Sequence, residues 1–488
     1  MTLTSAIRTA TNALSNSSRQ ISTISQNISG VGNTEYVRRE AQIVTGANGQ
    51  ATVEIVRRVD QSMQEALGIA NSRQALQQIV NQYYDKLSLT LGGNDNAYSA
   101  SALLGELGDA IDLAASSPSD STALTVVTER ARELAGMLND SYGEILSLKQ
   151  DADKAASAGV KHINELLASI KEVNDEIVQG TQTGRDVFDA MDKRDALVSQ
   201  LSEEISISVR QRPDGDIAIF TNSGLTLFDR VPREVEFQPI SVYGPNTTGN
   251  ALYVDGVPAT GPDAGLAVTG GSVVGHIQAR DDVLAQQQVR LDELARGLVE
   301  AFAETDQTGG GKPALAGLFT WSGGPALPAS GTLESGIALS ITLNSALDPL
   351  EGGNPALLRD GGINGDADYV ANTTSAASYP DLLLEFSAGI SQSRSYDGST
   401  GLIADGGIDA FADTFVGAFE QSRSDAADRL EYRTELQARL LASLQSDTGP
   451  NLDYEMSQLL EVEKAYQASA KLIAAADQLL ATLMDTIG

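Results

Sequence analysis

The two histidines of the chain, His162 and His276, are the first residues to consider for catalysis or metal binding. A nucleophilic triad would have to use one of them as its base, whereas a Cys/His zinc site is excluded because the chain has no cysteine. Neither histidine lies in an HExxH or GxSxG pattern, and each stands in or beside a helical stretch. We therefore interpret both as ordinary surface or packing histidines.

Two loop-like segments carry residue types that bind phosphate or calcium in other proteins. Gly309-Gly310-Gly311-Lys312 fails as a phosphate loop, because Asp306 occupies the first glycine position and Pro313 the Ser/Thr position. The acids from Asp360 to Asp368 lack the order and the distal glutamate of an EF-hand. Paired carboxylates for glycoside chemistry could lie among the 65 acids, but no spacing singles any out. We expect no catalytic, cofactor-binding or metal-binding residues, and no enzyme.

The net charge of −32 on 488 residues excludes two classes of partner. Nucleic acid and anionic lipid would both repel this chain, so we expect neither as a partner. No apolar run approaches the ~20 residues that cross a bilayer, so we expect no membrane insertion. The segment Met1–Arg8 lacks the basic, apolar and small-residue sequence of a cleaved signal peptide. Export of this protein would need a route without one.

Both ends of the chain carry apolar residues at seven-residue spacing, which is typical of coiled-coil helices. The N-terminal rows are Ile7, Leu14, Ile21 and Ile28, and Leu3, Ala10, Ser17, Ile24 and Val31. The C-terminal rows are Leu452, Leu459, Tyr466, Ile473, Leu480 and Ile487, and in part Val462, Ala476 and Leu483. Two arginines precede Glu35, whereas two lysines against six acids give −4 from Leu452 onward. The opposite signs favour pairing of the two ends.

An amphipathic helix packed on its own domain is the simpler interpretation of each stripe. The N-terminal stripe is almost uncharged on its other faces, whereas a solvated coiled coil usually carries Glu and Lys there. Burial of the apolar residues between only two helices would offset part of the backbone entropy that these residues lose on folding. A two-helix pair alone should therefore be marginally stable. We therefore expect the ends to be largely disordered in the free monomer, and to pair and fold when they pack on neighbouring copies.

The middle of the chain predicts a mainly α fold with inserted β-rich domains. Helical patterns lie near 59–90, 98–116, 119–178, 186–204, 272–305 and 407–446, and strand patterns near 205–210, 217–220, 235–237 and 251–254. The predicted domains are a terminal coiled-coil assembly domain (1–45 with 450–488), a helical-bundle body (46–204 with 271–305 and 381–449), a β-rich insert (205–270), and an irregular Gly/Pro-rich insert (306–380).

Two end motifs and a middle segment match known sequences. Near the N-terminus, Asn27, Ile28, Asn33, Thr34, Tyr36 and Arg38 resemble a motif shared by the flagellar axial family of rod, hook and hook-associated proteins. Glu35 departs from it, because a glycine normally precedes the tyrosine. Near the C-terminus, Glu455-Met456, Leu459-Leu460-Glu461 and Ala465-Tyr466-Gln467-Ala468-Ser469-Ala470 resemble the closing segment of the family, with Glu463-Lys464 in place of Gln-Arg. Three further segments look like parts of the first of the two hook-filament junction proteins. They are Gly270–Gly275, Ala279–Asp281 and Leu318-Phe319.

The resemblance implies a ring of copies with the hook protein on one side and the second junction protein and filament on the other. It also implies an extracellular place at the hook-filament junction, export through the flagellar type III apparatus, and a cytoplasmic export chaperone. The chaperone would hold the C-terminal helix at Leu459, Tyr466, Ile473 and Leu480. The expected assembly interface comprises Leu3, Ile7, Leu14, Ile21, Ile24, Ile28, Tyr36, Leu452, Met456, Leu459, Tyr466, Ile473, Leu480, Leu483 and Ile487.

Three alternatives remain open from the sequence. Another axial subunit, namely the second junction protein, the hook protein or a flagellin, would share the end helices. A secreted helical adhesin or type III effector would keep amphipathic helices without needing both end motifs. An enzyme is the third class, although the 306–380 insert shows no recognisable site.

Overall fold

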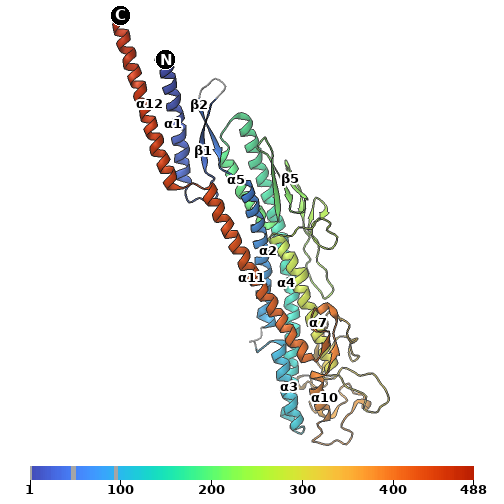
Figure 1. Ribbon diagram of the computed structural model, residues 1–488. Helices are drawn as coiled ribbons and strands as arrows, with labels where there is room; N and C mark the ends of the chain where they lie inside the picture. The colour runs from blue at the N-terminus through green and yellow to red at the C-terminus, as the bar shows by residue number, and fades with distance from the viewer. Residues whose placement is uncertain (1–2, 46–50, 93–96, 488) are drawn as a thin grey trace. The chain divides into compact units, whose positions relative to one another are not determined.

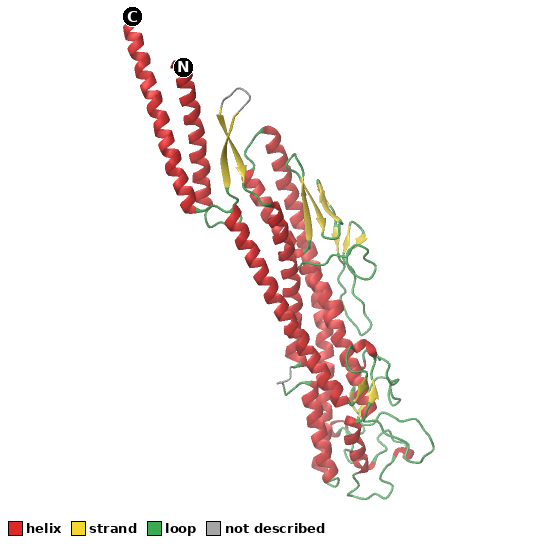
Figure 2. Cartoon of the chain, viewed as in Figure 1, coloured by secondary structure: helices red, strands yellow, loops and turns green. Residues whose placement is uncertain are grey.

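The computed structural model describes residues 3–45, 51–92 and 97–487, and the chain is mainly helical with small antiparallel sheets, as predicted (Figures 1 and 2). Contacts group the chain into two compact units. Unit 1 comprises Met1–Ser72, Ile163–Glu234 and Thr434–Gly488, and unit 2 comprises Arg73–His162 and Val235–Arg433. The helices α2 (Gln61–Leu91), α4 (Ser121–Thr183) and α11 (Ile408–Thr448) contribute residues to both units.

Unit 1 contains the two end helices, a hairpin and a four-stranded sheet. Its remaining elements are α1 (Leu3–Gly30), β1 (Arg39–Thr45), β2 (Ala51–Arg57), α5 (Phe188–Glu204), β3 (Ile207–Gln211), β4 (Ile217–Thr221), β5 (Thr226–Asp229), β6 (Val231–Pro232) and α12 (Leu452–Ile487). The hairpin pairs Arg39 with Arg57 at its base, and the sheet has the order β3-β4-β5-β6.

Unit 2 combines helices with a long stretch of little regular structure. Its helical elements are α3 (Ala100–Ser116), α6 (Ser272–Gln278), the π-helix η1 (Ala279–Val283), α7 (Leu284–Ala301), α8 (Ile337–Ser340), η2 (Pro349–Glu351), α9 (Leu357–Asp360), η3 (Ala367–Tyr369), α10 (Asp381–Ser391) and η4 (Gly398–Thr400). Its strands are β7 (Val235–Glu236), β8 (Tyr253–Val254), β9 (Val257–Pro258), β10 (Phe319–Thr320), β11 (Thr342–Leu343), β12 (Arg394–Ser395) and β13 (Asp405–Gly406).

Local capping explains where several helices begin. The Ser99 hydroxyl accepts a hydrogen bond from the amide of Ala102 at the start of α3, and Asp120 accepts from Thr122 before α4. Asn451 accepts from the amide of Tyr454 and so caps α12, as its place after Gly449-Pro450 suggests. The predicted helices therefore agree with the observed ones to within a few residues.

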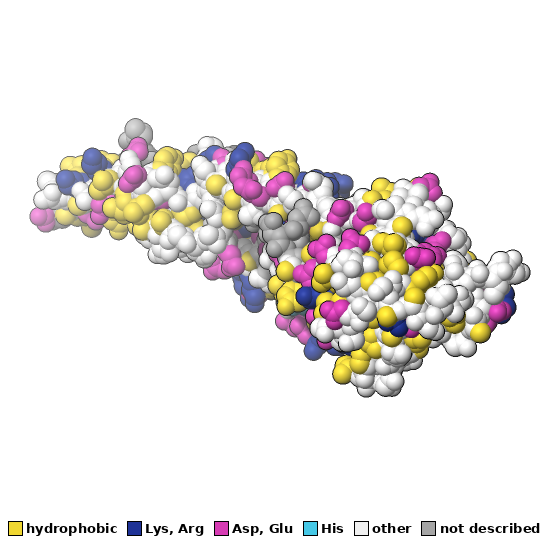
Figure 3. Space-filling model, turned by 90° about the horizontal axis from the view of Figure 1, so that it is seen from below, with side chains coloured by type: hydrophobic (Ala, Val, Ile, Leu, Met, Phe, Trp, Pro, Cys, Tyr) yellow, Lys and Arg dark blue, Asp and Glu magenta, His cyan; other side chains and the backbone are white. Residues whose placement is uncertain are grey.

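On the face shown in Figure 3, hydrophobic side chains lie exposed among polar and acidic ones.

The core of unit 2 is continuous and aromatic. Phe302 meets the rings of Phe319 and Phe386 edge-on, with centroids 5.5 and 5.9 Å apart, and Phe411 stacks on Tyr396 at 4.2 Å. The T-shaped pairs have the geometry that aromatic quadrupoles favour. The only tryptophan, Trp321, packs against this core and donates its ring N–H to the carbonyl of Ala326 at 2.9 Å.

Glycine and arginine explain the segment that leads into α7. A Cβ on Gly275 would lie 3.0 Å from Cβ of Ile79 and 3.1 Å from the carbonyl oxygen of Leu76, so α6 packs closely on α2 at this point. In η1, Arg280 reaches the buried carboxylate of Asp153 at 2.6 Å and the carbonyl oxygen of Asn250 at 2.9 Å. This arginine therefore holds the loop before β8 against α4.

Helix α7 is buried on nearly every side, yet many of its buried residues are polar. Asp292 accepts the amides of Gly336 and Ala338, each at 3.0 Å. Gln286 donates to the carbonyls of Ser399 and Thr400, and Gln288 donates to that of Pro245. These side chains supply hydrogen-bond partners to the amides and carbonyls of irregular segments, which belong to no β-sheet there.

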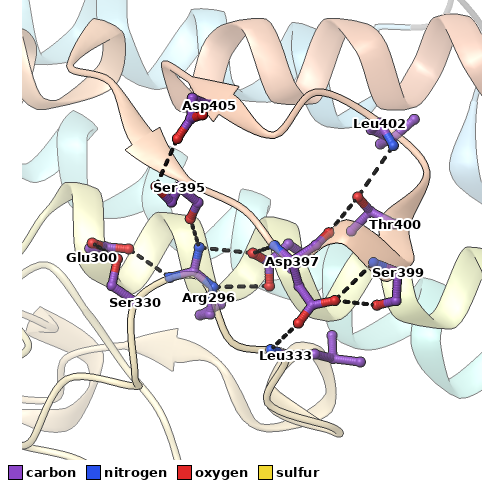
Figure 4. Close-up of polar contacts among 11 residues, drawn as sticks. Arg296, Glu300, Ser330, Leu333, Ser395, Asp397, Ser399, Thr400, Leu402 and Asp405 are labelled. Carbon is purple, nitrogen blue, oxygen red and sulfur yellow. Dashed lines mark hydrogen bonds and ion pairs between the residues drawn. The ribbon is translucent and has the colours of Figure 1, made fainter.

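Arg296 is the most deeply buried cation of this helix, with no exposed side-chain surface. Its guanidinium pairs with Glu293 at 2.8 Å. Figure 4 shows its pair with Glu300, at 2.6 Å, and its hydrogen bond to the carbonyl of Ser395, at 2.7 Å. Glu293 in turn accepts the amide of Asp397 at 2.8 Å. The cluster therefore fixes the 395–400 segment on α7.

Replacing Arg296 with methionine is expected to lower the free energy of unfolding of unit 2 by about 3–5 kcal/mol, because Glu293 would be left buried without a cation. Urea unfolding followed by the fluorescence of Trp321 measures this loss, since that residue reports on unit 2 alone. The matched control is Arg423→Met, which breaks a half-buried pair with Glu420 on α11, whose side chains are 41% and 23% exposed. Its cost should stay below about 0.5 kcal/mol, and equal costs for the two variants would contradict the assignment.

Candidate assembly interface

The end helices α1 and α12 lie side by side, as Figure 1 shows in blue and red. Their buried positions are mostly small: Ala10 and Ser17 on α1, and Ser469 and Ala476 on α12. Ile24 is the large side chain that is buried on α1. The buried row of α1 is thus the second heptad row of the sequence, not the row of four larger residues from Ile7 to Ile28.

The predicted interface residues fall into three groups. Ile24 is buried, and a half-buried group consists of Ile7, Leu14, Ile21, Ile28, Tyr36, Leu459 and Ile473. The exposed group consists of Leu452, Met456, Tyr466 and Leu480. The side chains of Leu3, Leu483 and Ile487 lie outside the described part of the structure. Apart from Ile24, the described residues therefore keep apolar surface in contact with solvent, and their role in assembly stays a prediction.

Helix α12 exposes further large apolar side chains beside these. Leu472 and Leu479 are 63% and 61% exposed, and Leu460 and Met484 are exposed as well. They stand at helical positions away from the row that faces α1, so the apolar surface extends around the helix. A helix of this kind is normally buried within a larger structure, and a contiguous exposed apolar patch marks an interaction site.

Asn27 fixes the turn that follows α1. Its side-chain oxygen accepts hydrogen bonds from the amide of Arg39 at 3.0 Å and from the hydroxyl of Tyr36 at 2.9 Å. Its side-chain nitrogen donates to the carbonyl of Arg39 at 2.9 Å. Asn27 is 1% exposed, so three of its hydrogen-bonding positions are satisfied inside the protein.

The ring of Tyr36 closes this turn over Gly30. A Cβ on Gly30 would lie 2.5 Å from the ring, so only glycine leaves room for it. Burial raises the pKa of Tyr36 to about 12. The left-handed residue of the turn is Gly32, with φ of 87°, whereas Glu35 has no such backbone angle. The replacement of the usual glycine by Glu35 therefore leaves the turn unstrained.

A buried ion pair joins the two ends of the chain. Nε of Arg38 donates to the carboxylate of Glu455 at 2.6 Å, and its guanidinium lies 4.6 Å from the ring centre of Tyr454. The amide of Arg38 also donates to the carbonyl of Thr448 at 2.8 Å. Glu455 is 1% exposed, so the pair is shielded from solvent and holds the start of α12 beside the N-terminal turn.

Two further arginines tie the hairpin to α5. Arg39 pairs with Asp189 and lies 3.5 Å from Asp192, while Arg57 pairs with Asp192 at 2.6 Å and with Asp195 at 2.8 Å. Burial raises the pKa of Asp192, and the two arginines oppose that effect. Arg39 and Arg57, which pair at the base of β1 and β2, therefore both bind acids on one face of α5.

The residues considered above for catalysis or ligand binding either make other contacts or lie exposed. His276 accepts or donates a hydrogen bond with the hydroxyl of Tyr83 at 3.1 Å, and burial lowers its pKa to about 4. His162 is exposed on α4. Lys312 pairs with Asp366 at 2.9 Å and with Asp368 at 2.5 Å. Among the described residues, no group of three His, Asp or Glu side chains could hold a metal ion.

Unit 1 also contains a cavity of about 850 Å³, lined by the turn 32–37, α2, α5, β3 and the end of α11. Its lining mixes apolar side chains such as Leu67 and Leu444 with Glu203 and Arg194. The guanidinium of Arg194 is committed to Asn174 at 3.1 Å and to the carbonyl of Gly215 at 2.6 Å. No described helix is both long and apolar enough to cross a membrane.

Sequence reasoning missed the pairings of the three arginines. Arg38 and Glu455 both stand in the end motifs, 417 positions apart, but neither motif indicates which acid an arginine meets. The only signal was the opposite charge of the two ends, which favours the encounter without naming the pair.

Two family models match the chain. Residues 84–314 match the model described as the flagellar hook-associated protein FlgK helical domain, and residues 451–486 match the C-terminal model of the flagellar basal body rod FlgEFG proteins. The second match covers α12 and therefore the apolar surface described above. The two matches occur in the order that the sequence motifs suggested.

Flagellar hook-associated protein 1 of Bacillus subtilis is 22% identical over 76% of this chain and 72% of its own length. The Escherichia coli protein of that name is 28% identical over 40% of this chain, and the Salmonella typhimurium protein is 22% identical over 62%. These two matches cover 37% and 56% of the relatives, less than two thirds of their length. The solved flagellar hook junction protein FlgK from Burkholderia pseudomallei aligns with a TM-score of 0.43 and 19% identity, over 53% of this chain and 47% of that one.

Replacing Asn27 with alanine is expected to destabilise the turn after α1 by about 2–3 kcal/mol, because the Tyr36 hydroxyl and the Arg39 backbone lose buried partners. Amide hydrogen exchange over Tyr36–Thr45 should accelerate accordingly. Asn16→Ala is the control, since its single bond to the carbonyl of Ala51 is exposed and should change exchange there little. Unchanged exchange in the Asn27 variant would show that the side chain does not hold the turn.

Proposed function

We infer that this chain, a member of the FlgK family of flagellar hook-associated proteins, forms the junction between the hook and the filament. It is a structural subunit of the flagellar axis, and its place is the flagellum. The finer assignment to the junction is our proposal. The helical middle of the chain supports it, since that part matches the hook-associated family model rather than a rod or hook model.

The observation that carries the proposal is the apolar surface that α12 leaves uncovered. One side of α12 contacts α1, while Leu460, Leu472, Leu479 and Met484 remain exposed on others. One further helix could cover only one of these sides, so we propose that the pair is surrounded by end helices of several copies. A closed ring of copies satisfies this requirement, because each copy then offers and receives the same surfaces.

The partners follow from this arrangement as proposals. We place the hook protein on one side of the ring, and the second junction protein and the filament on the other. Before export, the same surface on α12 would need cover. We propose that a cytoplasmic chaperone binds it at Leu459, Tyr466, Ile473 and Leu480, of which Tyr466 and Leu480 are exposed. Export would then proceed through the flagellar type III apparatus without a cleaved signal.

Deletion of the gene is expected to leave hooks intact and to abolish filaments, because the hook tip would lack the ring on which flagellin assembles. Electron microscopy of the cells and immunoblotting of flagellin in the medium measure the two effects. A plasmid copy of the gene should restore filaments. Cells without hooks, or cells with normal filaments, would contradict the junction assignment.

The double variant Leu472→Ser, Leu479→Ser is expected to fold but not to restore filaments, since it removes about 2–4 kcal/mol of apolar burial from each copy in the ring. The amount of this protein in purified hook preparations should fall at least about tenfold. The control, Leu350→Ser with Leu384→Ser, alters two exposed leucines of unit 2 and should assemble normally. Normal assembly of the first variant would show that this side of α12 contacts no neighbour.

A further inference from the structure

Four polar side chains meet in the water-excluded space between α4 and α7 of unit 2. Tyr142 and Lys149 come from α4, and Gln288 and Asp292 come from α7. Tyr142 is fully buried, Asp292 is 1% exposed, and Gln288 and Lys149 are 4% and 6% exposed. The apolar side chains of Ile145, Leu148, Leu284 and Leu291 belong to the core that surrounds these groups.

The carboxamide of Gln288 is held on both sides. Its oxygen accepts a hydrogen bond from Nζ of Lys149. Its nitrogen donates to the hydroxyl of Tyr142 at 2.6 Å and to the carbonyl of Pro245 at 2.8 Å. The lysine therefore stands at the carbonyl end of the amide, and the tyrosine stands at the nitrogen end.

A proton path continues beyond the nitrogen end. The hydroxyl of Tyr142 lies 3.3 Å from Oδ2 of Asp292 and donates to it. Burial raises the pKa of Asp292 to about 7, so this carboxyl holds a proton over part of the neutral range. Burial also lowers the pKa of Lys149 to about 8, so a fraction of its amine is uncharged and nucleophilic near neutral pH.

We propose that Lys149 and Gln288 join in an intramolecular isopeptide bond. The uncharged amine attacks Cδ of Gln288, a bond forms between Nζ and Cδ, and the bond between Cδ and Nε2 breaks. Tyr142 gives a proton to the leaving nitrogen and regains one from Asp292, solvent takes the proton that Nζ loses, and Asp292 regains a proton from solvent, so that the protons balance. The leaving group is ammonia, and no oxidant or second reactant is consumed.

The fold supplies what such a reaction lacks in solution. Amine and amide are held in contact by two packed helices, and positioning of this kind replaces a high concentration of free amine. A proton delivered to the leaving nitrogen assists the step that limits amide exchange. The product would link α4 to α7 covalently in a chain that has no cysteine for a disulfide.

The mass of the folded full-length chain, measured after incubation and then denaturation, tests the proposal. The expected result is a mass lower than the sequence mass by one ammonia, with a fragment in which the peptides of Lys149 and Gln288 are joined. Lys149→Arg should abolish the loss, and Lys154→Arg, which alters an exposed lysine one turn further on, should leave it complete. An unreduced mass in the folded wild-type chain would overturn the proposal.

Two variants separate the proton path from simple packing. Asp292→Asn and Tyr142→Phe keep the size of each side chain, and each is expected to slow the mass change about tenfold or more. Trp321 fluorescence checks that the variants are folded, and only folded samples enter the comparison. An unchanged rate in both folded variants would contradict the roles of Tyr142 and Asp292, and a mass loss that persists in Lys149→Arg would contradict the bond itself.

Discussion

Backbone hydrogen bonding is the constraint that shapes unit 2. The long stretch between α7 and α10 forms only two-residue strands and one-turn helices, so most of its amides and carbonyls have no ladder to join. Helix α7 and the residues after it provide partners instead: Asp292 for Gly336 and Ala338, and Glu304 for Ile363. A buried amide without a partner costs as much as a lost hydrogen bond, so an apolar α7 would leave this insert unfolded.

Some of the side chains that bind this backbone are charged and buried, and a buried charge must itself be paired. Arg296 sits between two glutamates, and Arg280 sits between Asp153 and Asp281. Each of these arginines also donates to a backbone carbonyl of a loop. The planar, forked guanidinium suits this double role, since it binds a carboxylate and still has donors left for backbone. Irregular backbone and buried ion pairs are therefore two aspects of one arrangement.

The helices were predictable from the sequence because periodicity is local. The spacing of apolar residues predicted α2, α3, α5 and α11 to within a few residues. The end pairing followed from heptads and charge, and the end motifs indicated the flagellar family. The half-buried and exposed surface at predicted interface residues such as Ile7 and Leu480 is consistent with the predicted interface without testing it.

The fold of the 306–380 insert could not be predicted from the sequence, for a physical reason. Its order comes from apolar side chains at irregular spacing, such as Leu318 and Ile341, that join the core of unit 2, and from single hydrogen bonds such as that of Asn364 to the carbonyl of Ala316. No periodicity accompanies contacts of that kind. The same holds for Arg38 with Glu455 in unit 1, where the paired residues stand at opposite ends of the chain. The predicted division into four domains likewise depends on long-range contacts and stays a prediction.

Lys149 is a buried cation whose hydrogen-bond partner is neutral, as are Arg194 and Arg290, but a guanidinium stays charged in proteins whereas an amine can lose its proton. Arg38, Arg39, Arg280 and Arg296 each face at least one carboxylate, as a buried positive charge requires. The hydrogen bond of Lys149 goes to a neutral carboxamide instead. A charged ammonium gains less from a carboxamide than from a carboxylate, so burial is opposed less effectively and the uncharged amine is favoured. An amine at this position is thus better suited to act as a nucleophile than as a structural cation.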